Sequence, residues 1–146
     1  ITILWERNGL SEVAATAATR AWIKLAGYWI AEHGSRFAWA YVHERGSVNG
    51  AHVHILLHVP PKLKREFRAN PLRWAKAVLP QPYMRKTVRS HCILGADAPD
   101  GISRKSYAFN LDGKLHYMVK TAPLELEHEL GLATWGRSRW GPKGRI

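Results

Sequence analysis

The sequence is poor in cysteine, in acidic residues and in long apolar runs. Its single cysteine, Cys92, excludes an internal disulfide and a zinc site built from several cysteines. No apolar run reaches the length that a membrane-spanning helix needs, and the opening segment is charged where a signal peptide would be apolar. We therefore expect a cytoplasmic protein without a membrane partner.

Positive charge dominates what is present. The 22 lysines and arginines outnumber the 11 aspartates and glutamates, which gives a formal net charge of +11 at pH 7. Such an excess on a small protein favours a polyanionic partner, most often nucleic acid, and predicts association with the nucleoid. The seven tryptophans add side chains on which nucleic-acid bases can stack.

The length of 146 residues fits one domain, and we assign residues 1–146 to it. Because the sequence begins at Ile1 rather than Met, we expect this domain to come from a longer protein. The sequence has no Gly-x-x-x-x-Gly-Lys-Ser/Thr segment, so a helicase, if one is needed, would be another domain or a partner.

Local patterns predict an α+β fold, in which helices pack mainly on one face of a central antiparallel sheet. Ser11 and Gly34 are typical of the start and end of a helix, and Val13, Ala17 and Trp22 fall roughly on one face of it. We expect strands at residues 1–5, 37–44, 51–59, 87–94 and 103–109, and helices at residues 11–32, 62–69, 72–79 and 113–121.

The strand at residues 51–59 carries the first chemical signal. Its alternation puts Val53 and three further apolar residues on one face, and His52 and His54 on the other. Two imidazoles that are two strand residues apart can reach one metal ion. His58 lies roughly 13 Å further along the strand than His54 and is not expected to be a ligand.

The preceding hairpin strand supplies a third ligand. A five-residue loop at residues 46–50 makes Glu44 the partner of His52, and directly opposed residues share a face. A loop of even length would bring His43 there instead, so His43 stays an alternative. Two imidazoles and one carboxylate leave coordination positions for a substrate on Mg or Mn.

A tyrosine and a lysine form a second candidate element. Tyr117 and Lys120 are three residues apart in the expected helix at residues 113–121, so they face the same way. A tyrosine hydroxyl can attack a phosphate that a metal polarises, while a nearby cation supports the developing charge. Tyr107 is the second choice for the nucleophile, because no lysine follows it at the same offset.

These elements together resemble the HUH endonuclease superfamily, and most closely its single-tyrosine replication initiators of the rolling-circle type. The likeness rests on His52-Val53-His54, on Tyr117-Met118-Val119-Lys120, on the first-strand segment Ile1-Thr2-Ile3-Leu4, and on their order along the chain. It covers roughly residues 1–120 of the sequence.

The resemblance implies site-specific cleavage of single-stranded DNA. A divalent metal held by Glu44, His52 and His54 would bind the scissile phosphate, and Tyr117 would attack it. The products would be a 5′-phosphotyrosine bond and a free 3′-OH, and Lys120 would help to position the phosphate or the metal. Such chemistry serves replication initiation or transposition.

The C-terminal segment and two rival functions complete the expectations. Aromatic and basic side chains in the tail are candidates for DNA binding, namely Trp135, Arg137, Arg139 and Trp140. A basic nucleic-acid-binding module without catalysis would use this tail alone. A metal-dependent nuclease that activates water would need the three metal ligands but not Tyr117.

Overall fold

The computed structural model describes residues 1–96 and 101–119 of the chain. The chain divides into two compact units, Ile1–Cys92 and Ile93–Ile146. The assignment of residues 1–146 to a single domain stays a prediction.

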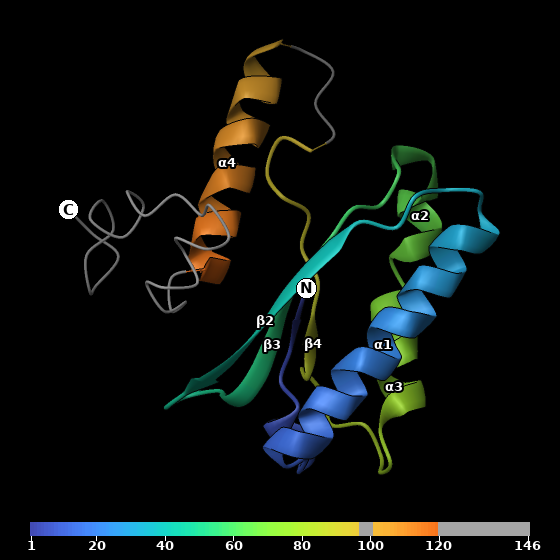
Figure 1. Ribbon diagram of the computed structural model, residues 1–146, viewed down its shortest axis with the longest axis vertical. Helices are drawn as coiled ribbons and strands as arrows, with labels where there is room; N and C mark the ends of the chain where they lie inside the picture. The colour runs from blue at the N-terminus through green and yellow to red at the C-terminus, as the bar shows by residue number, and fades with distance from the viewer. Residues whose placement is uncertain (97–100, 120–146) are drawn as a thin grey trace, which may run out of the picture. The chain divides into compact units, whose positions relative to one another are not determined.

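The first unit is built on a four-stranded antiparallel sheet with the strand order β2-β3-β1-β4. Its strands are β1 (Thr2–Ile3), β2 (Trp39–Gly46), β3 (Gly50–Leu57) and β4 (Val88–Arg89). The β2–β3 hairpin is long, whereas β1 and β4 pair over only two residues each, on the other side of β3. The helices of this unit gather on one side of the sheet (Figure 1), so the expected α+β architecture is confirmed.

The helices of the first unit are η1 (Glu6–Asn8), α1 (Glu12–Glu32), η2 (Pro61–Leu63), α2 (Lys64–Phe67) and α3 (Asn70–Val78). The helix predicted at residues 11–32 is confirmed, whereas the helix predicted at residues 62–69 is divided in two, the one predicted at residues 72–79 begins two residues earlier, and the 3-10 helix at residues 6–8 is not predicted. Ser11 caps α1, because its Oγ accepts a hydrogen bond from the N–H of Ala14 at 3.3 Å. Gly34 follows the last turn with φ of +63°, the left-handed conformation that ends many helices.

The core lies between the sheet and α1. Trp5 and Trp22 are fully buried, and each indole N–H has a partner: Trp5 donates to the Thr19 hydroxyl at 2.8 Å, and Trp22 donates to the Pro71 carbonyl at 3.1 Å. These two bonds fix α1 against β1 and α3. The expected apolar face of β3 is confirmed, since Val53 is buried in this core.

The expected inward face of α1 is partly wrong. Val13 is 82% exposed and Ala17 is also exposed, whereas Trp22 is buried as expected. The residues that α1 buries are Ala15, Ala18, Thr19, Trp22, Ile23, Ala26 and Ile30. Small residues set this face because they let the helix approach the bulky Trp5, so the larger Val13 does not mark the inward direction.

The described part of the second unit contains one helix, α4 (Gly101–Val119). The expected strand at residues 103–109 is therefore wrong, and so is a helix that starts only at residue 113. Aromatic residues such as Tyr107 raise strand propensity only weakly, and a glycine inside a helix costs about 1 kcal/mol, so Gly113 does not interrupt it. In the first unit, the expected strand at residues 87–94 shortens to β4.

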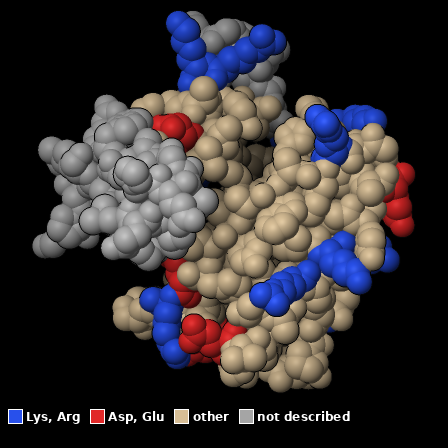
Figure 2. Space-filling view, in the orientation of Figure 1, with Lys and Arg blue, Asp and Glu red and all other residues tan. Residues whose placement is uncertain are grey.

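The surface adds two observations. Among the described residues, no helix is both long and apolar enough to cross a bilayer. On the face drawn in Figure 2, lysines and arginines stand in separate groups between uncharged residues, rather than in one continuous patch.

Candidate metal centre

Hairpin pairing brings three potential metal ligands together. Glu44 lies directly opposite His52, as predicted, and His54 follows two residues along β3 on the same face. The strands pair as far as Gly46 and Gly50, so the loop has three residues rather than the predicted five, and its odd length keeps the register. Glu44 Oε2 lies 3.6 Å from Nε2 of His52 and 3.6 Å from Nε2 of His54. One ligand atom from each of the three residues falls within 4.8 Å of the others.

Both imidazoles are held at their other ring nitrogen. His52 Nδ1 lies 2.8 Å from the Gly50 carbonyl oxygen, and His54 Nδ1 lies 3.0 Å from the Thr2 hydroxyl oxygen. An oxygen partner at Nδ1 fixes the ring orientation of a metal-binding histidine and raises its basicity. Because a carbonyl oxygen can only accept, Nδ1 of His52 is the donor, and Nε2 is the ring nitrogen on the side of Glu44.

This donor set fits a divalent cation. Two ligand atoms at normal coordination distances from one ion are separated by about 3.0–3.5 Å, and the separations of 3.6 Å need only a small adjustment to match. Two neutral imidazoles and one carboxylate also balance part of the charge of the ion. A group made of Glu44, His52 and His54 could therefore hold a metal ion.

The cluster is more enclosed than an open sheet face suggests. The side chains of His52, Glu44 and His54 are 6%, 14% and 24% exposed. His54 is thus the most exposed of the three ligands. Burial also excludes water from the ligands, which strengthens the attraction between the carboxylate and a cation.

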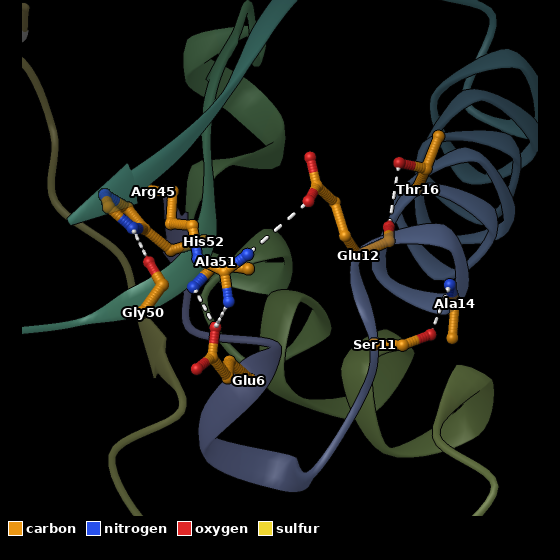
Figure 3. Close-up of polar contacts among 9 residues, drawn as sticks. All are labelled: Glu6, Ser11, Glu12, Ala14, Thr16, Arg45, Gly50, Ala51 and His52. Carbon is orange, nitrogen blue, oxygen red and sulfur yellow. Dashed lines mark hydrogen bonds and ion pairs between the residues drawn. The ribbon is translucent and has the colours of Figure 1, made fainter. Parts of the chain in front are cut away.

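A carboxylate clamp holds the hairpin next to His52 (Figure 3). Glu6 Oε2 accepts the Ala51 N–H at 2.6 Å and lies 3.6 Å from the Arg45 guanidinium, which also lies 3.7 Å from Glu12. Gly50 turns the chain here with φ of +61°, and a Cβ at this position would stand 2.6 Å from the Glu6 carboxyl carbon. These contacts fix the register that sets Glu44 beside His52.

His43, the alternative third ligand, lies on the opposite face. It pairs with Val53, which is fully buried in the core, and its ring meets Tyr41 edge-on. Burial lowers the pKa of His43, while the Glu12 carboxylate acts in the opposite direction. Its Nε2 is buried and makes no hydrogen bond within the described part of the chain. The register thus groups Glu44, and not His43, with the two histidines.

The remaining candidates belong to the second unit or lie outside the described residues. Tyr117 is on α4, where the residue is 39% exposed, and the neighbouring His116 Nδ1 lies 2.9 Å from the Asp112 carbonyl oxygen. Lys120 and the four tail candidates Trp135, Arg137, Arg139 and Trp140 lie outside the described residues. The roles expected of Tyr117 and these residues stay predictions.

The three candidate ligands Glu44, His52 and His54 are called the metal cluster from this point. Two residues that contact or support it are missed by the sequence patterns. Thr2 holds His54 only because β1 pairs with β3, and Glu6 holds the hairpin only because η1 lies under it. Thr2 does fall in the first-strand segment of the family resemblance, but its contact depends on strand order, which no local pattern specifies. Comparison of the chain with family models, with curated proteins and with solved structures gave no match.

Proposed function

We propose that this protein is a metal-dependent endonuclease that nicks and rejoins single-stranded DNA, as HUH-type replication initiators and transposases do. The observation that carries the proposal is the Glu44, His52 and His54 cluster, in which both histidines are oriented through Nδ1. The net charge of +11 supports a polyanionic substrate. A cytoplasmic, nucleoid-associated location and a separate helicase are parts of this proposal.

The metal cluster would hold Mg or Mn. When bound, the ion would supply Lewis-acid polarisation of the scissile phosphate. Glu44 contributes the negative charge of the site, while Thr2 and the Gly50 carbonyl keep the two imidazole rings directed at the same point. Because a three-residue ligand set does not fill the coordination positions of these ions, a phosphate oxygen can also bind.

Tyr117 would be the nucleophile. Its hydroxyl oxygen forms a bond to phosphorus as the bond from phosphorus to the 3′-oxygen breaks. The phenolic proton leaves to solvent, and the departing 3′-oxygen takes up a proton to become a 3′-OH. Lys120 would stabilise the phosphate during transfer. The new phosphotyrosine ester keeps the energy of the broken ester, so the reverse reaction can join strands.

A covalent-adduct assay tests this proposal. The protein is incubated with a library of end-labelled single-stranded DNA and Mn²⁺, and denaturing gels then retain any protein–DNA adduct. We expect an adduct with the wild type and with Tyr107→Phe, the matched control on α4, and none with Tyr117→Phe. We also expect His54→Ala to abolish the adduct and His58→Ala, on an exposed residue beyond the cluster, to retain it.

A second candidate is a metal-dependent nuclease that activates water. The enclosed ligand cluster favours it, because all three ligands lie in Ile1–Cys92 and need no residue of α4. Cleavage without an adduct, unchanged in Tyr117→Phe, would replace the first proposal with this one. Tight, salt-sensitive DNA binding without any cleavage would instead indicate a non-catalytic binding module.

A further inference from the structure

One row of residues crosses the sheet beside the metal cluster. His54 on β3 pairs with Val42 on one side and with Thr2 on the other, and Thr2 pairs in turn with Arg89 on β4. Directly opposed residues point to the same face, so Arg89 shares the face of the metal ligands. Neighbouring strands are about 4.8 Å apart, so the Arg89 Cα lies about 10 Å from that of His54.

Arg89 places positive charge on this face. It is exposed, and it forms no ion pair within the described part of the chain. In contrast, Arg45 at the hairpin end is engaged by two carboxylates. Arg89 therefore carries positive charge that no carboxylate engages, in the same row as His54, the most exposed of the three ligands.

A buried polar network fixes the position of β4. Asn8 and Thr87 are 1% and 0% exposed, and the Asn8 amide donates to the Thr87 hydroxyl, which donates to the Met84 carbonyl at 2.8 Å. Asn8 Oδ1 accepts the Met84 N–H at 2.8 Å, and the Leu4 N–H donates to the Thr87 carbonyl at 2.8 Å. These hydrogen bonds tie the backbone just before Arg89 to Leu4, which follows β1, and to Asn8 on η1.

We propose that Arg89 binds a backbone phosphate of single-stranded DNA next to the phosphate that the metal cluster holds. This inference rests on the proposed function and adds a substrate-binding residue to the same site. A guanidinium forms paired hydrogen bonds with phosphate oxygens, and an arginine side chain is long enough to meet a phosphate that lies between β4 and the cluster. The single-stranded DNA would then cross β1 between His54 and Arg89.

The test measures binding rather than cleavage. The full chain, with Mn²⁺ present, is titrated against a short fluorescein-labelled oligo-dT by fluorescence anisotropy at several salt concentrations. Loss of one phosphate contact to a single strand reduces the slope of log K against log salt by about 0.7. We expect this reduction in Arg89→Ala and Arg89→Gln, together with a Kd raised about tenfold at low salt. Arg73→Ala, which changes an exposed arginine of α3, is the matched control and should match the wild type.

Two outcomes would overturn the inference. An unchanged slope and Kd in Arg89→Ala would show that this side chain does not contact the strand. Charged residues on edge strands also prevent pairing between molecules, so an unchanged slope with increased self-association would assign that role to Arg89 instead. The adduct assay gives an independent answer. If the wild type forms an adduct but Arg89→Ala leaves the salt slope unchanged, only the Arg89 contact is refuted. If Arg89→Ala reduces the slope but the wild type forms no adduct, only the nicking chemistry is refuted.

Discussion

The hydroxyl of Thr2 provides a direct way to test how the metal cluster is organised. It is the oxygen partner of His54 Nδ1, at 3.0 Å, and Thr2 is the strand neighbour of His54. The substitution Thr2→Val removes this hydroxyl but keeps the shape of the side chain, and valine is favourable in strands. The fold should persist, while His54 loses the contact that orients its ring.

The expected loss of metal affinity follows from what an oxygen partner does for a metal-binding histidine. Removing the oxygen partner of a metal-ligating histidine typically lowers metal affinity 10- to 100-fold, which corresponds to about 1.4–2.8 kcal/mol. Because the His54 side chain is only 24% exposed, water replaces the lost hydroxyl poorly. We therefore expect Thr2→Val to weaken Mn²⁺ binding by at least tenfold, and Thr2→Ser to bind as the wild type does.

Isothermal titration calorimetry with Mn²⁺ measures this difference. Thr16→Val is the matched control, because the Thr16 hydroxyl donates to the Glu12 carbonyl within α1, at 3.1 Å, away from the metal cluster. Equal Mn²⁺ affinity for the wild type, Thr2→Val and Thr16→Val would refute the argument that Thr2 orients His54.

Two further predictions concern the hairpin and the metal. Gly50→Ala should lower the free energy of unfolding by about 1–2 kcal/mol for its left-handed φ and further for the clash with Glu6. Gly34→Ala is the control, because Gly34 has a similar φ but no heavy atom within 4 Å of an added Cβ. The difference between the two variants in urea unfolding measures the clash with Glu6, and equal losses of unfolding free energy would argue against the clamp. Mn²⁺ at 100 times its Kd should raise the free energy of unfolding by about 2.7 kcal/mol. Glu44→Gln should lose most of this gain in a thermal melt, and a gain that persists would argue against Glu44 as a ligand.

The hairpin could be predicted from the sequence because its information is local. Strand alternation separates Val53 from His52 and His54, and the odd loop length sets Glu44 opposite His52. Both rules act within about fifteen residues of chain. The same rules leave His43 on the core face.

The features that the sequence did not predict depend on contacts between distant segments. The inward face of α1 follows from the contact between Thr19 and Trp5, and not from where the larger Val13 falls. The partner of His54 and the position of Arg89 both require β1 to lie between β3 and β4, a strand order that no local pattern encodes. For α4, propensity alone could not decide between a strand with a short helix and one long helix.

The most direct test of the central claim is to find the covalent bond itself. After reaction of the full chain with single-stranded DNA and Mn²⁺, the protein is digested with trypsin and nuclease, and peptides that carry a nucleotide are sequenced by mass spectrometry. The account predicts a nucleotide linked through its 5′-phosphate to Tyr117. Cleaved DNA without any nucleotide-linked peptide, or a nucleotide linked to another residue, would contradict it.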